Sequence, residues 1–375
     1  PVDLLMVSHV DDDHIRGILD LTREERERRD ARRALLLQVL SFWHNSFDAV
    51  IEHNTDALTA AVRGHFGEAS TQGGGLPDDA VEAVEEASEE EPEVVRTGLE
   101  VLASIGQGFQ LRRDAEVLEY PRNPEFDGGL VLAREGGGAL DAGGGLSLTV
   151  VGPMLEELDE LRRKHVAWLR ELQAEGRPPE SALAAYVDKS VANLSSIVVL
   201  AEAGGKRMLL TGDARGDRIL AGLELVGLVE KGGRLDVDIL KVPHHGSANN
   251  LDNDFFQRIV ASHYVFSGDG EHGNPERESL EMLFRARGRE PFTVHLTYPV
   301  DEIDAERKRD WEKEQRKEMR RQEKNPDVRV RPDWSDEANG LAAFLARTEL
   351  AEGQEVCIVD KELPHLIELL DPVGF

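Results

Sequence analysis

Residues 8–14 of this 375-residue chain read Ser8-His9-Val10-Asp11-Asp12-Asp13-His14, directly after a short apolar run. Histidine and aspartate are seldom crowded this closely. A turn after a strand can point alternate side chains to one side, so His9 and Asp11 could hold one metal ion while Asp13 and His14 reach a second. The alternative is a polar turn in which an aspartate caps a helix that begins at His14.

Two later motifs place similar side chains at the ends of apolar strands. Asp213 follows the strand 207–210 in Thr-Gly-Asp, and the pair His244-His245 follows the strand 237–242. An aspartate at a strand end suits a bridging metal ligand, although alone it is more often an Asx turn that closes the strand. Two histidines followed by Gly-Ser are seldom a packing solution, and the alternative is a pair of surface histidines in a turn.

One further histidine lies in a glycine-containing loop, and seven others lack ligand-like neighbours in the sequence. His272, in Glu-His-Gly-Asn-Pro, could orient a substrate or shuttle protons, or it could bond its own backbone. The seven without such neighbours are His44, His53, His65, His165, His263, His295 and His365. We expect no metal-ligating role for these seven.

Composition narrows the classes of partner and compartment. The net charge of -29 argues against general electrostatic capture of nucleic acid, which normally needs a basic surface. No apolar run approaches the roughly 18 residues of a membrane span, and the only cysteine, Cys357, excludes an internal disulfide. We expect a cytoplasmic protein without a membrane partner.

The pattern of elements is mixed α and β. Strands are predicted at 3–8, 146–151, 196–202, 207–210, 237–242 and 356–359, with Gly204-Gly205 as a hairpin turn. Helices are predicted from His14, over 153–172 and over 304–324, and residues 34–42 read as the buried end of a helix that begins exposed. Residues 43–47, which begin with Trp43, could line a pocket mouth but are more often a helix end that packs on the core. Residues 73–93 are glycine-rich and then acidic.

The three motifs, in this order, resemble the metallo-β-lactamase superfamily. The branch that they resemble most contains the hydrolase domain of bacterial DNA-uptake competence proteins and stand-alone relatives, which carry Asp where typical members carry a second His. Residues 190–196 and 271–275 also fit this branch. The resemblance implies an αββα sandwich with the metal site at one edge. It covers the start of the chain and 186–285, and is weak over 50–145 and after 300.

The resemblance also implies the ligands and their roles. The implied metal ligands are His9, Asp11, Asp13, His14, Asp213 as the bridge, and His244. His245 would be a ligand or a proton carrier, and the implied catalytic residues are Asp13, His245 and His272. The superfamily usually has another His before the bridging Asp, and Asn193 stands near that place here. The carboxylate-rich set shifts the expected ion from Zn²⁺ toward Mn²⁺, with one or two ions bound.

The implied domains are a metallo-hydrolase core at 1–21 and 146–300, a largely helical, acidic insertion or cap at 22–145, and a charged helix with a C-terminal extension at 301–375. Members of the superfamily place several strands before the first metal motif. We therefore expect that this sequence lacks those strands, or that a partner supplies them.

The expected function is hydrolysis by a metal-activated water, and by analogy with the branch the first expected substrate class is a small-molecule or nucleic-acid phosphodiester. Thioester or lactone hydrolysis is an alternative. A different class of function is a regulatory or binding protein on a degenerate hydrolase scaffold.

Overall fold

The computed structural model describes residues 1–45, 83–84, 107–108, 110–159, 162–163, 166–167 and 195–370. The chain divides into two compact units. Pro1–Arg134 and Gly152–Ile197 form the first, called here the amino-terminal unit, and Glu135–Val151 and Val198–Phe375 form the second, called the sheet unit. The domain division implied by the resemblance stays a prediction.

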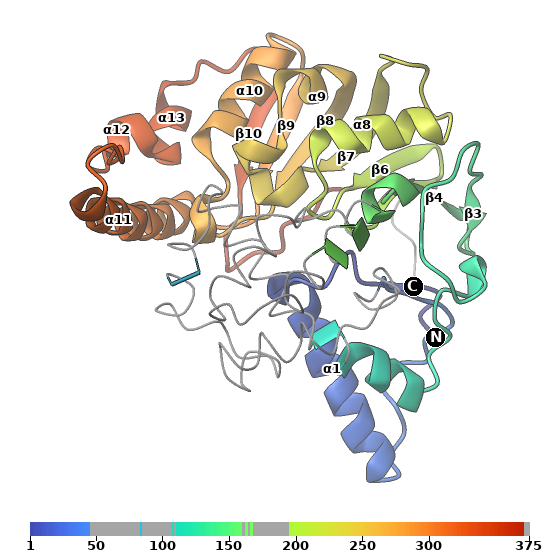
Figure 1. Cartoon of the computed structure of the whole chain (residues 1–375). Coiled ribbons are helices and arrows are strands. Elements are labelled where there is room, and N and C mark those ends of the chain that lie inside the picture. Colours follow the sequence, from blue (N-terminus) through green and yellow to red (C-terminus); the bar gives the residue numbers. More distant parts are fainter. Residues whose placement is uncertain are drawn as a thin grey trace. The chain divides into compact units, whose positions relative to one another are not determined.

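An eight-stranded sheet is the centre of the sheet unit (Figure 1). Its strands lie in the order β10-β9-β8-β7-β6-β5-β4-β3. Strands β6, β7, β8, β9 and β10 are parallel to one another, whereas β5 is antiparallel to β6 and β3 to β4. The bounds are β3 Leu140–Asp141, β4 Leu146–Gly152, β5 Val198–Ala203, β6 Lys206–Leu210, β7 Leu235–Lys241, β8 Ile259–Phe266, β9 Phe292–Leu296 and β10 Gln354–Ile358.

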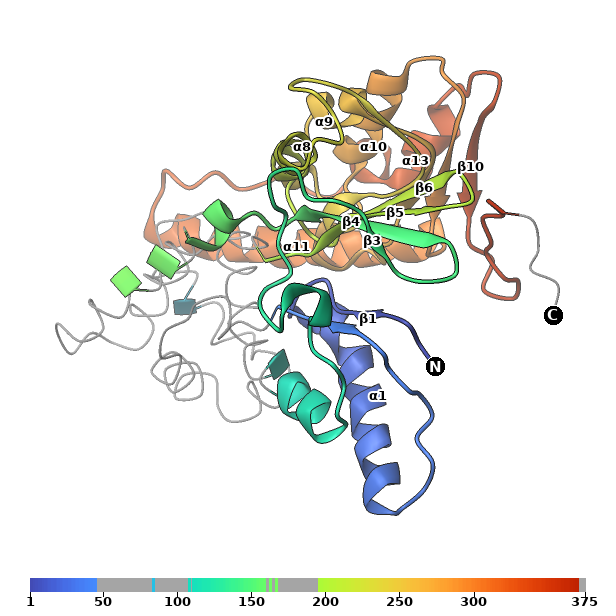
Figure 2. The ribbon, with the colours of Figure 1, turned by 90° about the vertical axis from the view of Figure 1, so that its right-hand side faces the viewer.

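Helices cover one face of this sheet, and the main apolar core lies between the sheet and these helices. Figure 2 shows α8, α9, α10 and α13 on the same side of the strands. Alternate side chains of β8 and β9, among them Tyr264 and Val294, pack there against Phe255 of α9 and Leu283 of α10. The helices are α8 Gly216–Leu225, α9 Asn253–Arg258, α10 Arg277–Arg287, α11 Val300–Lys324, α12 Asp336–Asn339 and α13 Leu341–Arg347.

The sheet unit confirms the predicted α/β class and several predicted elements. Gly204 and Gly205 join β5 to β6 with φ of 56° and 77°, as a tight hairpin turn requires. The predicted long charged helix at 304–324 begins four residues earlier, at Val300. The strand predicted at 356–359 is β10.

The amino-terminal unit contains two short parallel strands and a long helix. β1 Leu5–Met6 pairs with β2 Phe42–Trp43, and α1 runs from Asp12 to Asp30. A helical segment at 110–117 lies against α1, since Asp114 accepts hydrogen bonds from Thr22 Oγ1 and Arg26 Nη1. Val7, Ile15, Phe42 and Leu111 are among the residues that form its core.

The prediction of a helix ending at residues 34–42 is wrong. α1 ends at Asp30, and Arg32 has a left-handed backbone with φ of 54°. The Glu25 carboxylate accepts hydrogen bonds from the amides of Leu36 and Leu37, so the chain turns back along the helix instead of continuing it. Trp43 is buried, as predicted, but it lies in β2 and not at a helix end.

Residues 46–82, 85–106 and 109 of the predicted insertion or cap lie outside the described residues, as do His53, His65, His165 and Asn193. Among the helices that the structure describes, none combines the length and the apolar content that a membrane crossing requires.

Candidate metal centre

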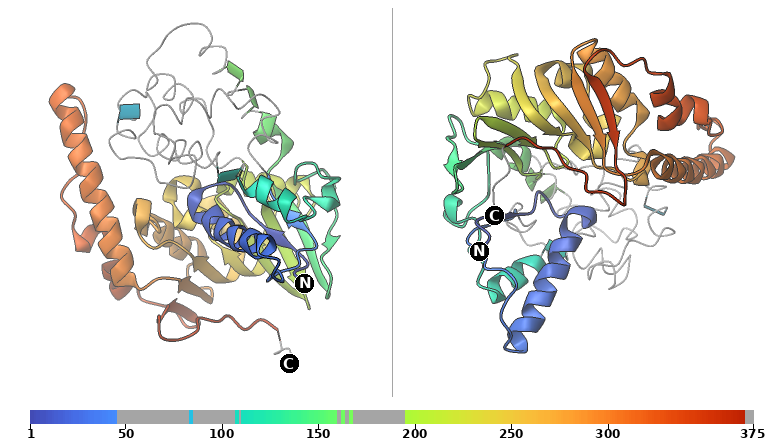
Figure 3. Two further views of the ribbon diagram at one scale, coloured as in Figure 1. Left: turned by 90° about the horizontal axis from the view of Figure 1, so that it is seen from below. Right: turned by 180° about the vertical axis from the view of Figure 1, so that it is seen from behind.

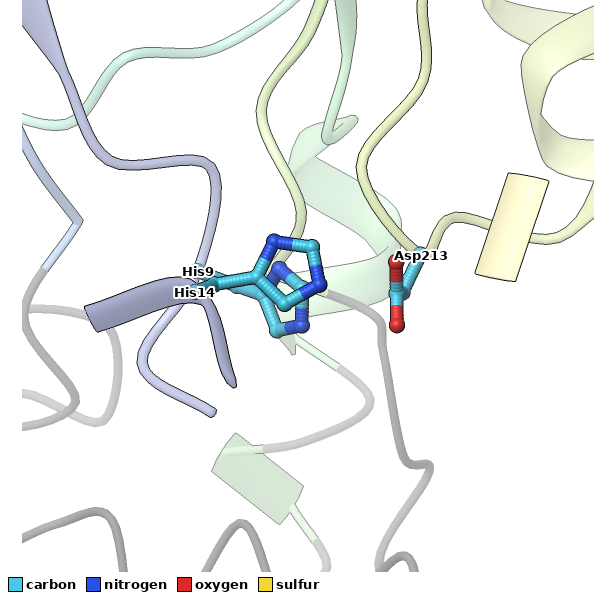
Figure 4. A group of neighbouring side chains, drawn as sticks. All are labelled: His9, His14 and Asp213. Atoms are coloured by element: carbon cyan, nitrogen blue, oxygen red, sulfur yellow. The ribbon is translucent and has the colours of Figure 1, made fainter. Parts of the chain in front are cut away.

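The amino-terminal cluster lies where the chain passes from β1 into α1. His9 and Asp11 are buried, with 2% and 7% of their surface exposed. Ser8 Oγ lies 3.1 Å from His9 Nδ1 and 3.1 Å from His14 Nδ1. One hydroxyl therefore fixes the Nδ1 side of both imidazoles and leaves their Nε2 atoms as the ligand candidates. The ring centroids are 4.1 Å apart (Figure 4).

Each imidazole of this cluster also has a carboxylate beside its Nε2 atom. His9 Nε2 lies 3.2 Å from Asp11 Oδ2, and His14 Nε2 lies 3.4 Å from Asp13 Oδ2. Asp13 is largely exposed, unlike Asp11. These are the pairs predicted from the sequence to bind separate ions, and that assignment stays a prediction.

Asp11 does not act as a helix cap with its side chain. α1 begins at Asp12, two residues before the predicted start, and Asp11 occupies the capping position without a hydrogen bond from its carboxylate to the helix. Asp11 Oδ1 is buried and has no hydrogen-bond partner among the described residues. A buried carboxylate oxygen normally has a partner, and a bound cation would supply one. The donor set of the cluster therefore fits a divalent ion.

The sheet-edge cluster is assembled by the parallel strands of the sheet unit. Asp213 follows β6, His244 and His245 follow β7, and Ser267 follows β8. Because β6, β7 and β8 are parallel neighbours, their carboxyl ends meet at one edge. This edge is where ligands bind in open α/β sheets.

The contacts of this cluster centre on the Asp213 carboxylate, which Figure 4 draws at the loop after β6. Asp213 Oδ2 lies 3.8 Å from His244 Nε2 and 3.6 Å from His245 Nε2. His245 Nδ1 lies 3.1 Å from Ser267 Oγ, which fixes the ring with Nε2 toward Asp213. Asp213 is 3% exposed. An imidazole-carboxylate set of this kind can bind a divalent ion or relay a proton.

A cation of the chain itself also lies beside Asp213. Lys241 Nζ donates to the Gly212 carbonyl at 2.8 Å and lies 3.4 Å from Asp213 Oδ1. The ammonium lies by Oδ1, whereas the two imidazoles lie by Oδ2. Lys241 thus compensates part of the buried charge and leaves the Oδ2 side to the histidines.

The histidine loop holds an unusual backbone. His244 and His245 have φ of 46° and 52°, the left-handed region that is costly for residues other than glycine. The His244 amide donates to the Gly212 carbonyl at 3.2 Å, and the Ser247 amide donates to the His244 carbonyl at 2.8 Å. Residues with this backbone gather at functional sites, because surrounding contacts must hold them there.

Glu276 connects the histidine loop to the loop that carries His272. Its carboxylate accepts from the Ala248 amide at 2.8 Å and from Ser247 Oγ at 3.3 Å, and its amide donates to the Gly246 carbonyl. Burial raises the pKa of Glu276, and the hydrogen bond from Ala248 opposes that rise. The two loops are therefore held together by a partly desolvated carboxyl group.

Arg307 of α11 holds the loop that carries His272. Its guanidinium donates to the Gly273 carbonyl at 3.0 Å and to Asp304 Oδ1 at 3.2 Å. Burial lowers the pKa of Arg307, and the Asp304 charge opposes that change. His272 itself is exposed, with a left-handed φ of 54°.

Sequence reasoning missed the residues that orient the site. Ser8, Lys241 and Glu276 carry no motif signal of their own. Ser8 directly precedes the first histidine, which is the one hint that was available for it. Lys241 and Glu276 act through contacts between loops that only the sheet brings together.

Comparisons with known proteins give partial similarities, and no family model matches the chain. The chain is 36% identical to rat microtubule-associated protein 1A over 76 residues, and 35% identical to the human protein over 81 residues. These matches cover 20% and 21% of this chain, but 3% of each relative. ComE operon protein 3 of Bacillus subtilis (strain 168) is 27% identical over 139 residues, which are 34% of this chain and 15% of that protein. The chain thus spans a small part of the length of these relatives.

Proposed function

We propose that this chain is a metal-dependent hydrolase of the metallo-β-lactamase fold that acts on phosphodiesters. The observation that carries the proposal is the sheet-edge cluster, where Asp213 meets His244 and His245 at the ends of parallel strands. The amino-terminal cluster supports it with a second imidazole-carboxylate set. That both clusters serve one site, within an αββα sandwich, rests on the sequence resemblance. The local similarity to ComE operon protein 3 supports the competence-type branch.

The residues that would hold the metal are His9, Asp11, Asp13, His14, Asp213 and His244. A bound divalent ion supplies an activated water near neutral pH and stabilises negative charge on the reacting phosphate. As many carboxylates as imidazoles are available, which favours Mn²⁺ over Zn²⁺.

The chain's own residues orient these groups and move protons. Ser8 holds the two amino-terminal imidazoles by their Nδ1 atoms. His245, held by Ser267, can pass a proton between its Nε2 atom and the leaving group. His272 would act from the neighbouring loop, which Arg307 holds through Gly273.

The second candidate function is a binding protein on a degenerate hydrolase scaffold. Lys241 favours it, because an ammonium group 3.4 Å from Asp213 Oδ1 compensates charge that a metal ion would otherwise balance. Metal analysis separates the two functions. Less than about half an equivalent of Mn, Zn or Fe after purification without chelator, and no stabilisation by added metal, would favour the binding role.

Hydrolysis of bis-p-nitrophenyl phosphate with added Mn²⁺ tests the proposed activity. We expect turnover by the wild-type chain, loss of turnover in Asp13→Ala, and unchanged turnover in Asp20→Ala. Asp20 is a matched control, since it also lies on α1 but forms an exposed ion pair with Arg23. Full activity of Asp13→Ala would show that the assigned site is wrong.

A further inference from the structure

Three histidines of the sheet unit form a continuous row of ring contacts that includes none of the proposed metal ligands. We call this row the histidine chain. His263 lies in β8, His295 in β9, and His365 in the segment that follows β10. His263 Nδ1 lies 3.0 Å from His295 Nε2, and His295 Nδ1 lies 2.8 Å from His365 Nε2. The middle ring therefore uses both of its nitrogens, one toward each neighbour.

The histidine chain joins the C-terminal segment, residues 359–370, to the face of the sheet opposite α8, α9, α10 and α13. Val294 and Leu296 point into the helix-covered core, so His295 between them points to the opposite face. The segment runs from β10 past β9 to the β5–β6 turn, where the Leu370 side chain lies against Gly204. Figure 3 (right), the view from behind, shows it crossing in front of the strands.

Few other contacts hold the segment. None of its residues is buried, and Leu363 and Leu366 are 65% and 74% exposed. The Val359 amide donates to the Leu296 carbonyl at 3.0 Å, at the end of β10, and Lys361 forms an exposed ion pair with Glu302. An exposed pair contributes little, so the contact between His295 and His365 is the main polar attachment beyond Val359.

The number of protons on the three imidazoles decides whether both contacts of the histidine chain can persist. Each nitrogen-nitrogen contact needs one nitrogen with a hydrogen and one without. Three neutral imidazoles satisfy both contacts, with all N–H groups pointing the same way. One added proton can sit on an outer nitrogen, either His263 Nε2 or His365 Nδ1, and both contacts remain. A second added proton must place two N–H groups face to face, which breaks one contact.

Charged groups of three neighbouring strands act on the histidine chain. Asp238 of β7, Lys206 of β6 and Glu355 of β10 act on His263, and Lys206 also donates to Asp238 at 2.9 Å. Cys357 of β10 is the register partner of His295. Burial, followed by the neighbouring His263 and His365, lowers the pKa of His295 to about 4. Burial also lowers the pKa of His263, which the Asp238 and Glu355 charges oppose.

We propose that the chain His263, His295 and His365 is a pH-sensitive latch that holds residues 359–370 on the sheet at neutral pH and releases them on acidification. The sign follows from proton binding: in the docked state burial, followed by the neighbouring His263 and His365, lowers the pKa of His295 to about 4, and detachment removes His365 and part of that burial, which moves the pKa back toward its ordinary value of 6.5. Docking is therefore strongest above about pH 6.5 and weakens as the pH falls toward 4. At pH 5.5 the docking equilibrium should be weaker by up to about tenfold than at pH 7.5.

Continuous-wave electron paramagnetic resonance on the full chain measures the release. A nitroxide on Glu368→Cys, in a Cys357→Ser background, reports how mobile the segment is. We expect an immobilised spectrum at pH 7.5 and a mobile fraction that rises by up to about tenfold at pH 5.5. The variant His365→Ala should be mobile at both values, and Leu366→Ala, a matched control in the same segment, should behave as the parent.

Three results would overturn the latch. One is the same spectrum at both pH values in the parent chain. Another is an immobilised spectrum in His365→Ala, provided that its circular dichroism spectrum shows a folded protein. The third is release by EDTA at pH 7.5, since the histidines would then share a metal ion and not a proton. Nitrogen-15 spectra of labelled histidine add a separate test, because nitrogens that share a proton differ from solvated imidazole nitrogens.

Discussion

The amino-terminal cluster and the sheet-edge cluster use the same types of side chain, histidine and aspartate, but are built in different ways. The amino-terminal cluster comes from seven consecutive residues, and one hydroxyl, Ser8 Oγ, orients both of its imidazoles. The sheet-edge cluster comes from the ends of three strands, and its histidines adopt a left-handed backbone. None of residues 8–14 has such a backbone. A local cluster depends on few supports, whereas a cluster assembled by a sheet depends on many.

Ser8→Ala should have the largest effect of the changes that leave every proposed ligand in place. Loss of the hydroxyl frees both imidazoles to rotate. Removing the hydrogen-bond partner of a metal ligand typically lowers metal affinity or activity by about 10–100-fold. Mn²⁺ affinity, measured by titration calorimetry, should fall by that factor. The matched control is Ser335→Ala, which removes a helix-capping hydroxyl in the sheet unit. Wild-type affinity in Ser8→Ala would contradict the orienting role.

Gly246→Ala should disturb the sheet-edge cluster without touching a ligand. Gly246 has φ of 92°, and a Cβ there would lie 2.6 Å from Phe266 Cδ1 and 2.9 Å from Pro275 Cβ. We expect a loss of about 1–3 kcal/mol in unfolding free energy together with lower activity.

Gly227→Ala is the control for that change, because Gly227 has φ of 77° with no atom within 4 Å of the added Cβ. It should cost only the backbone penalty of a left-handed residue with a Cβ, about 1–2 kcal/mol, and leave activity unchanged. Equal losses of stability in the two variants, measured by urea unfolding, would show that crowding around Gly246 is unimportant.

Glu276→Gln should have the smallest effect, and its sign should depend on pH. Burial raises the pKa of Glu276, so the folded protein holds this proton more tightly than the unfolded chain. Stability from this group is therefore present at low pH and lost as the pH rises above 4.5. At pH 7 the unfolding free energy of the Gln variant should equal that of the wild type or exceed it by up to about 1 kcal/mol. At pH 4.5 we expect no gain.

Glu276→Ala is the contrasting variant, because it removes the acceptor for Ala248 and Ser247. It should cost about 1–3 kcal/mol at pH 7 by thermal unfolding. If the Gln variant lost as much unfolding free energy as the Ala variant, the charge of Glu276 and not its hydrogen bonds would stabilise the fold.

Much of the sheet unit could be predicted from local patterns. Gly204-Gly205 between two apolar runs indicated the hairpin, and strand ends followed by Asp213 or His244-His245 indicated the site. Local patterns did not predict β8 and β9. Each carries a histidine within an apolar run, His263 and His295, which weakens the pattern of a strand.

The remaining features depend on contacts between distant segments. His263, His295 and His365 have no ligand-like neighbours in the sequence, yet parallel pairing and the C-terminal segment bring them together. The end of α1 depends on Glu25 binding the amides of Leu36 and Leu37, which no periodicity signals. Contacts of this kind become visible only when the tertiary structure is known.

The most direct test of the central claim is Mn²⁺ binding by the wild type, His14→Ala, Asp213→Ala and the control Asp217→Ala. Asp217 lies in α8 and forms an exposed ion pair with Arg215. If both clusters serve one site, His14→Ala and Asp213→Ala should each lose more than about 100-fold in affinity, because even the supporting partners of ligands are worth that much. The control should bind as the wild type does. Wild-type affinity and stoichiometry in Asp213→Ala would contradict the shared site.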